Sequence, residues 1–308
     1  MINVISMSGG KDSTATALLA IEAGGDNRYV FADTGNEHQL TYEYLDYLES
    51  ALGITINRVK ADFSAQVIRK REIVRTKWVS DGAVTPEKAE EICKHLVPTG
   101  NPFLDLCLWK GRFPSSRARF CSQELKHLPL DLHMLEMAGE GQLTSWQGVR
   151  AQESPARAKL PEREPGDFYE IYRPILSWTW EQVFEKHREH GIKPNPLYSL
   201  GMSRVGCMPC IHARKTELAE IGKRFPDQIA RIQKWEEKVS ISSKRGNSTF
   251  FSSSTDPTIA TKENDEITTD SHGIARIIDW AATSHGGRQR DIFATDTPVC
   301  ASAYGLCE

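Results

Sequence analysis

The first twenty-three residues constrain the fold more than any other stretch of the chain. Ile2 to Met7 form a short apolar run typical of a buried strand, and Ser13 to Ala23 have the Ala/Leu periodicity of a helix. The intervening "SGGKDS" contains Gly9 and Gly10, which let a backbone approach an anion closely. Amides at the helix start would face that anion at the favourable end of the helix dipole. The stretch predicts a phosphate cradle, with a simple glycine turn and helix cap as the alternative.

Strand-like and helix-like segments continue to alternate along the chain. Strands are expected in 28–35, 54–59, 142–150 and 169–176, and helices in 37–52, 179–191 and 273–285. This alternation predicts an α/β fold with a doubly wound, mostly parallel sheet of five strands. Ligands of such sheets bind outside the carboxyl ends of the strands, where "SGGKDS", "DTG" (33–35) and "GVR" (148–150) all fall.

Two segments interrupt the alternation and suggest how the chain is organised. Residues 64–118 combine a charged helical stretch with a turn-rich one, and we interpret them as a helical insertion near the site. Residues 240–271 are polar without apolar periodicity, which predicts a long loop, a lid or a disordered segment. We therefore expect a nucleotide-binding domain over 1–220 and a C-terminal region over 221–308 with helices, a Ser/Thr-rich loop and a cysteine-containing tail.

Composition excludes several classes of protein. A net charge of -3 and a pI near 6.3 give no global attraction to nucleic acid or membranes. The apolar runs are far shorter than the roughly 20 residues that a membrane span needs, and the amino end is not a signal peptide. We expect a cytoplasmic protein without a membrane partner. Its seven cysteines then favour reduced thiols, metal ligation or redox chemistry over a disulfide framework.

The cysteines and the basic residues leave alternatives open. Cys207 and Cys210 form a C-x-x-C, which by itself fits zinc, iron-sulfur or redox chemistry. Cys93 and Cys107 have no such context and are predicted to be buried structural thiols. The stretch "IRKREIVRTK" is either the solvated face of an amphipathic helix or part of a basic surface for nucleic acid or for the 3'-phosphate of a nucleotide. The other members of that surface would be Arg112, Arg117, Arg119 and Lys126.

Five segments carry a family resemblance. "SGGKDS" after a first strand resembles the pyrophosphate loop of the adenine-nucleotide alpha hydrolase (PP-loop ATP pyrophosphatase) superfamily, whose members cleave ATP between the α and β phosphates. "FADTGNEHQLTYEYL", "RFCSQELKHLPL", "WQGVRAQES" and "NPLYSLGMSRVGCMPC" resemble segments of phosphoadenosine phosphosulfate (PAPS) reductases and their relatives, in the same order. Together they span roughly residues 1 to 215. The chain is thus similar to the PAPS reductase-like family, iron-sulfur type.

The resemblance implies roles for individual residues. Lys11, Asp12, Arg150 and Cys307 would be catalytic, with Arg150 binding the distal anionic group as a planar fork. Asp33, at a strand end, could take a ribose hydroxyl or Mg²⁺. The nucleotide-binding set would be Ser8, Gly9, Gly10, Lys11, Asp12, Ser13, Asp33, Thr34, Gly35, Gly148 and Arg150.

The resemblance also implies a [4Fe-4S] cluster. Its ligands would be Cys121, Cys207 and Cys210, with Cys300 or alternatively Cys307 as the fourth. Ser122 stands where the iron-sulfur relatives carry the second cysteine of a pair, so the four-thiolate pattern is one short. A tail cysteine would complete the set, unless the fourth iron is left open.

Three functions, two of them reactions, are considered for a chain that resembles this family, and the loop helps to discriminate among them. Members that cleave ATP and transfer sulfur to an acceptor keep the lysine-bearing loop, and Lys11 and Asp12 are both present. The alternative is a PAPS or APS reductase that forms sulfite with a tail cysteine, but Tyr304 stands at that position and Cys307 is offset. The third is a regulator that binds nucleotide without turnover. Expected partners are an adenine nucleotide (ATP, or PAPS or APS), a sulfur or electron donor protein, a nucleic-acid acceptor and a second copy in a homodimer.

Overall fold

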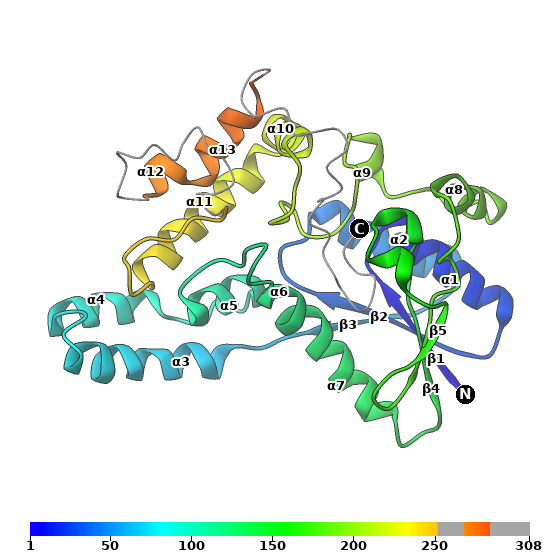
Figure 1. Cartoon of the computed structure of the whole chain (residues 1–308), viewed down its shortest axis with the longest axis horizontal. Helices are drawn as coiled ribbons and strands as arrows, with labels where there is room; N and C mark the ends of the chain where they lie inside the picture. The colour runs from blue at the N-terminus through cyan, green and yellow to red at the C-terminus, as the bar shows by residue number, and fades with distance from the viewer. Residues whose placement is uncertain (252–267, 284–308) are drawn as a thin grey trace. The chain divides into compact units, whose positions relative to one another are not determined.

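The structure is a computed structural model that describes residues 1–251 and 268–283 (Figure 1). The chain forms two compact units. We call the first, Met1–Lys60 with Ser122–His212, the sheet unit, and the second, Ala61–Cys121 with the described residues after His212, the helical unit. Cys300 and Cys307, like residues 252–267 of the polar segment, lie outside the described residues.

The sheet unit is built on a six-stranded sheet. Its order is β3-β2-β1-β4-β6-β5, and every pairing is parallel except that between β5 and β6. The prediction of a doubly wound, mostly parallel α/β sheet is confirmed, although the strand number is six rather than five. The strands are β1 (Ile2–Met7), β2 (Asp26–Asp33), β3 (Ile56–Lys60), β4 (Leu143–Trp146), β5 (Arg163–Pro165) and β6 (Glu170–Tyr172).

The additional strand, β5, has a local cause. It is three residues long, contains Pro165 and no apolar alternation, and sits at the sheet edge, where a proline is tolerated. Its antiparallel pairing with β6 aligns Arg163 with Tyr172. The guanidinium of Arg163 also lies 3.7 Å from the centre of the Tyr172 ring. Such a strand depends on its partner and leaves no periodic signal in the sequence.

Helices cover both faces of the sheet, which creates two cores. Leu18 of α1 (Lys11–Ala23) and Leu45 of α2 (Gln39–Leu52) pack with Ile5 on one face. On the other face, α7 (Leu128–Met137) packs Met134 against Val4. The remaining helical elements of this unit are η2 (Gln123–His127), η3 (Ala151–Glu153), η4 (Arg157–Lys159), α8 (Trp180–Glu189) and α9 (Pro196–Ser199), while α6 (Phe120–Ser122) spans the boundary between units.

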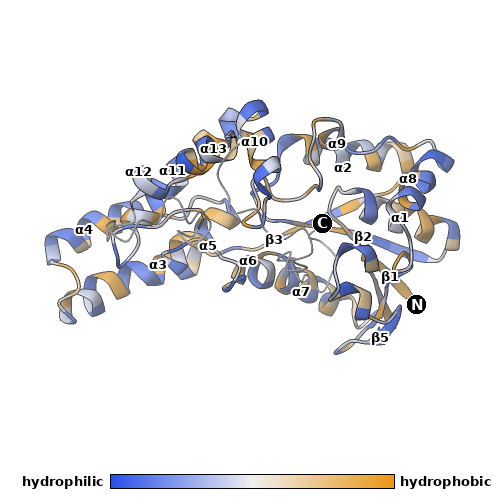
Figure 2. Cartoon of the chain, turned by 45° about the horizontal axis from the view of Figure 1, so that its top comes forward, coloured by the Kyte–Doolittle hydropathy of each residue, from blue (hydrophilic) through white to orange (hydrophobic). Residues whose placement is uncertain are grey.

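The helical unit is built of helices, and hydrophobic and hydrophilic residues alternate along most of their ribbons (Figure 2). Phe103, Phe113, Trp235 and Phe250 form an aromatic cluster, with Phe103 stacked on Trp235. The helices are α3 (Ser64–Ile73), η1 (Val74–Trp78), α4 (Pro86–His95), α5 (Pro102–Lys110), α10 (Lys215–Arg224), α11 (Pro226–Ile241), α12 (Thr269–His272) and α13 (Ile274–Ala281). No helix among the described residues is both long and apolar enough to cross a membrane.

Several finer expectations can be compared with this unit. Cys93 and Cys107 are buried, as predicted for structural thiols. The charged stretch around Arg69 is helical, as α3 followed by η1. The expected loop over 240–271 is too long at both ends, because α11 continues to Ile241 and α12 begins at Thr269. The described residues between Ile241 and Phe251 contain no helix or strand.

A buried carboxylate joins three parts of the helical unit. Glu236 of α11 accepts hydrogen bonds from the amides of Phe250 at 2.7 Å and Ile274 at 3.0 Å. Burial raises the pKa of Glu236 to about 7, and these amide hydrogen bonds only partly oppose that effect. The side chain therefore holds the start of α13 and the Phe250 segment in place. Its burial disfavours the ionised form of the carboxylate.

Glu236 should make the stability of this unit depend on pH. With a folded pKa of about 7 and an ordinary value of 4.5, its stabilising contribution is complete below about pH 4.5 and is lost as the pH rises through 7. Glu236→Gln keeps an acceptor but does not titrate. We expect the unfolding free energy of Glu236→Gln relative to wild type to rise by about 3 kcal/mol between pH 4.5 and pH 8. Denaturant titration followed by tryptophan fluorescence measures it, and a constant difference would contradict this account.

Candidate functional site

The loop after β1 folds as the sequence requires for a close backbone approach. Gly9 has a φ of +76°, and a Cβ at this position would lie 2.8 Å from Thr41 Cγ2. Within the loop, Ser13 Oγ accepts from the Ser8 amide at 3.1 Å, and Ser8 Oγ accepts from the Gly10 amide at 3.2 Å. The loop is therefore a pre-formed structure that leads directly into α1.

Three side chains from distant parts of the sheet unit hold this loop in place. Asn195 Nδ2 donates to the Gly9 carbonyl at 3.0 Å, and the Lys11 amide donates to the Tyr198 hydroxyl at 2.9 Å. His187 Nε2 lies 2.9 Å from the Lys11 carbonyl, which fixes the proton on Nε2. Burial lowers the pKa of His187, which favours the neutral ring.

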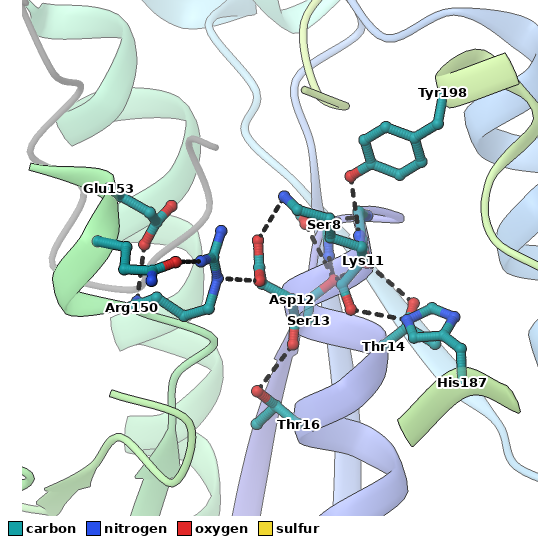
Figure 3. Close-up of polar contacts among 12 residues, drawn as sticks. Ser8, Lys11, Asp12, Ser13, Thr14, Thr16, Arg150, Glu153, His187 and Tyr198 are labelled. Atoms are coloured by element: carbon teal, nitrogen blue, oxygen red, sulfur yellow. Dashed lines mark hydrogen bonds and ion pairs between the residues drawn. The ribbon is translucent and has the colours of Figure 1, made fainter. Parts of the chain in front are cut away.

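The charged centre of the loop is a buried set of three side chains. Asp12 Oδ2 accepts from Lys11 Nζ at 2.7 Å, and Asp12 Oδ1 accepts from Arg150 Nε at 2.5 Å (Figure 3). Asp12 is 0% exposed. Although burial alone would raise its pKa, the charges of Lys11 and Arg150 hold the pKa of Asp12 below its ordinary value. The set therefore carries one negative and two positive charges.

Arg150 is positioned by the chain that follows β4. Its Nη1 donates to Gln152 Oε1 at 3.2 Å, and its amide donates to Glu153 Oε2 at 2.7 Å. Gly148 makes this approach sterically feasible, because a Cβ there would lie 2.9 Å from the Asp12 carbonyl carbon and the Ser13 amide nitrogen. The strand end and the loop are thus in direct backbone contact.

A second polar cluster follows β2. Thr34 Oγ1 donates to Glu37 Oε1 at 2.6 Å, and the Tyr42 hydroxyl lies 2.7 Å from Asp33 Oδ1 and 3.2 Å from Glu37 Oε2. The Gly35 amide also donates to Asp33 Oδ1 at 2.9 Å. Burial raises the pKa of Glu37, against the hydrogen bond from Thr34. Asp33 is thus already hydrogen-bonded at the place where a ribose hydroxyl or Mg²⁺ was expected.

The C-x-x-C loop lies against this cluster. The Met208 amide donates to the Asn36 carbonyl at 2.7 Å, and Asn36 Nδ2 donates to the Pro209 carbonyl at 3.0 Å. Cys207 Sγ lies 3.4 Å from Thr34 Oγ1. Burial and then the negative charge of Glu37 raise the pKa of Cys207 to about 12, so the free thiol is protonated at neutral pH.

The predicted cluster ligands are not all gathered in the described structure. Cys207 and Cys210 belong to the sheet unit, Cys121 is the last residue of the first segment of the helical unit, and Cys300 and Cys307 are outside the described residues. Among the described residues, no three His, Cys, Asp or Glu side chains are arranged to hold a metal ion. The donor chemistry of Cys207 and Cys210 fits iron-sulfur or zinc ligation, since a metal removes the thiol proton. The ligand set remains a prediction.

The structure brings together most of the predicted nucleotide-binding residues. "SGGKDS", Gly148 and Arg150 form one connected set, and Asp33 to Gly35 form part of the second cluster. Sequence reasoning assigned no role to four further residues: His187, Asn195, Tyr198 and Glu37. Asn195 and Tyr198 lie in the "NPLY" segment. The resemblance of this segment to PAPS reductases was the signal that could have identified them. A small pocket at the ends of β1 and β2 includes Ser8, Glu37 and Lys126 in its lining.

Fold and loop together define a doubly wound α/β protein with a glycine-bearing loop between β1 and α1, and comparison with known proteins gives the family. The phosphoadenosine phosphosulfate reductase domain matches residues 2–213. The chain therefore belongs to this family, as its sequence segments predicted.

Individual relatives span different parts of the chain. An uncharacterised 37.8 kDa protein from the gpa 5' region of Escherichia phage 186 is 54% identical over 326 aligned residues, covering 100% of this chain and 97% of its own. The adenosine 5'-phosphosulfate reductase of Allochromatium vinosum is 36% identical over 84 residues, which are 27% of this chain and 33% of that protein. The crystal structure of the PAPS reductase of Candida auris in a phosphate complex is similar with a TM-score of 0.44 and 17% identity, over 68% of this chain and 83% of that one.

The contact at Gly148 yields a test of the site. Gly148→Ala places a Cβ against the backbone of Asp12 and Ser13, so that the loop must shift. We expect about tenfold weaker binding of ATP, equivalent to about 1.4 kcal/mol, measured by isothermal titration calorimetry. Gly139→Ala is the matched control, because no heavy atom lies within 4 Å of its added Cβ. Equal ATP affinities of the two variants would show that the loop does not bind the nucleotide.

Proposed function

We propose that this protein is an adenine-nucleotide-dependent sulfur-transfer enzyme that cleaves ATP to AMP and pyrophosphate. The observation that supports this most is the buried set in which Asp12 holds Lys11 and Arg150 on opposite oxygens. Two cations facing one carboxylate leave an excess of positive charge beside a glycine loop and a helix start, which suits a polyphosphate.

In the proposed reaction the loop binds and orients the phosphates. Phosphate oxygens would replace Asp12 as partners of Lys11 Nζ, while the amides at the start of α1 hold the same group. An acceptor oxygen attacks the α phosphorus, the bond to the bridging oxygen breaks, and pyrophosphate leaves with the negative charge that Lys11 and Arg150 stabilise. A sulfur nucleophile then displaces AMP from the activated acceptor.

A second candidate is the reduction of APS or PAPS to sulfite. It is favoured by relatives that are adenosine 5'-phosphosulfate reductases. In that reaction Arg150 would bind the sulfate, and a thiolate would attack the sulfur and release the nucleotide. The tail has Tyr304 where reductases carry this cysteine, and Cys307 is three positions later. This tail and the intact lysine-bearing loop both support ATP cleavage over sulfite formation.

Product analysis distinguishes these functions. The proposal requires that wild-type protein releases pyrophosphate and AMP from ATP when the sulfur acceptor is supplied in a cell extract. Lys11→Ala should lower the rate at least tenfold, because it removes a charge-assisted contact worth about 1.5–3 kcal/mol. The control is Lys193→Ala, which changes an exposed lysine of the same unit. Thiol-dependent sulfite release from APS or PAPS would establish the second candidate, and tight nucleotide binding without products a regulator.

We further propose that Cys207 and Cys210 ligate a [4Fe-4S] cluster together with Cys121 and one tail cysteine. Support comes from the C-x-x-C spacing and from the family resemblance of these positions. The cluster would supply a site for holding or reducing sulfur when bound. Until a metal binds, Glu37 and burial keep the Cys207 thiol protonated, which protects it from oxidation.

Anaerobic purification tests the cluster. We expect brown protein with iron and acid-labile sulfide, and loss of most iron in Cys207→Ser. The matched control is Cys93→Ser, which alters a buried thiol outside the proposed ligand set and should keep its iron. Cys300→Ser and Cys307→Ser then show which tail residue is a ligand, since one should lose iron and the other keep it. Colourless wild-type protein with one zinc ion per chain would contradict the proposal.

A further inference from the structure

Two segments of the helical unit are rich in cations and contain no acidic residue. The first, residues 106–121, includes Lys110, Arg112, Arg117 and Arg119. The second, residues 238–251, includes Lys238, Lys244 and Arg245. The net charge of the whole chain is -3, whereas both of these segments are strongly positive.

The structure places the two segments side by side, although they are more than a hundred residues apart. Lys70 Nζ donates to the Leu108 carbonyl and to the Ser242 carbonyl, both at 2.7 Å. Gly111 touches the second segment directly, because a Cβ there would lie 3.4 Å from the Ser242 carbonyl oxygen and 3.6 Å from Ser243 Cα. One buried lysine and one glycine thus join the segments into a single surface, which we call the basic surface (Lys110, Arg112, Arg117, Arg119, Lys244 and Arg245).

Five of the six side chains of the basic surface are exposed or lie over an aromatic ring, and the sixth, Arg119, donates from Nε to the Ser116 carbonyl at 3.0 Å. Arg112, Arg117, Lys244 and Arg245 are exposed. The Arg112 guanidinium lies 5.8 Å from the centre of the Phe120 ring. Lys110 Nζ is 3.6 Å from the centre of the Trp109 ring. Such cation and ring pairs present flat, charged groups that can contact both phosphates and bases.

Asp105, the acidic residue that directly precedes the first segment, does not neutralise the basic surface. Asp105 is buried, and its carboxylate accepts from the amide of Thr99 at 2.8 Å and from that of Gly100 at 3.0 Å. It therefore stabilises the start of α5 by local hydrogen bonds. Arg112 and Arg117 of the adjacent segment are exposed, so their guanidinium groups can contact an external polyanion.

We propose that the basic surface binds a single strand of nucleic acid, and thereby infer that nucleic acid is the acceptor class of the proposed sulfur transfer. The acceptor assignment rests on the proposed function, whereas the binding does not. Four of the six members are arginines, which suit phosphate forks and stacking on bases. A lipid surface fits less well, because none of the exposed large hydrophobic side chains of the described residues lies in either segment.

Fluorescence anisotropy with labelled mixed-sequence RNA and DNA 20-mers tests the binding in the absence of ATP. The charge-reversal pair Arg112→Glu with Lys244→Glu should weaken binding at least tenfold. It should also reduce the slope of log K against log salt by about 1.4, because two phosphate contacts with a single strand are lost. The matched control, Lys223→Glu with Lys234→Glu, makes the same charge change on exposed residues of α10 and α11 and should bind as wild type.

Further variants keep the outcome decisive. If the charge reversals prevent folding, Arg112→Gln with Lys244→Gln should still weaken binding and flatten the salt slope. Lys11→Ala should bind the strands normally, so failure of the ATP reaction and failure of nucleic-acid binding are separable. Equal losses in the basic-surface and control pairs would overturn the proposal. So would wild-type binding to vesicles of anionic phospholipid with no binding to either strand.

Discussion

The carboxylate of Asp12 is the interaction on which the site depends. It lies at the start of α1, fully buried, with Lys11 on one oxygen and Arg150 on the other. Burying an isolated charge is costly, and removing one member of such a set leaves the others uncompensated. Asp12 thus holds the charged groups of Lys11 and Arg150 beside the loop. Without this carboxylate, the two cations would turn toward solvent. The set retains one net positive charge, which an incoming anion can use without rearranging the backbone.

The sheet explains how residues from distant parts of the chain reach this carboxylate. β1 and β4 are parallel neighbours, so the loop after β1 and the segment after β4 emerge at the same edge. Gly148 then lets the two backbones touch, and Arg150 follows two residues later. The region around α8 and α9 adds the contacts of His187, Asn195 and Tyr198 to loop carbonyls and amides. These contacts hold the loop in one conformation, which reduces the entropy that ligand binding must remove.

The second polar cluster has a different physical character from the first. Burial raises the pKa of Glu37, and burial followed by the charge of Glu37 raises the pKa of Cys207. Cys207 is therefore an inert thiol unless a cation compensates the charge. Asp12 differs, because two cations stabilise its ionised form. The loop after β1 is therefore suited to an anion, and the cluster around Cys207 to a metal. The acid-free segments of the helical unit add a third charged feature, the basic surface, four of whose six members are exposed.

The sequence alone determined the strands β1 to β4 and β6, the helix after the loop and the family. Each is encoded by residues adjacent in the chain: an apolar run, a periodic Ala/Leu stretch and short ordered motifs. The sequence also located Lys11, Asp12 and Arg150, because glycine turns and strand ends are local features. Tertiary structure alone decided that Asp12 bridges both cations, that Asn195, His187 and Tyr198 brace the loop, and that Glu37 faces Cys207. Tertiary structure also decided the edge strand β5 and the contact between Gly111 and Ser242. These depend on pairings across tens to hundreds of residues, and burial there shifts pKa values by an amount that no local pattern specifies.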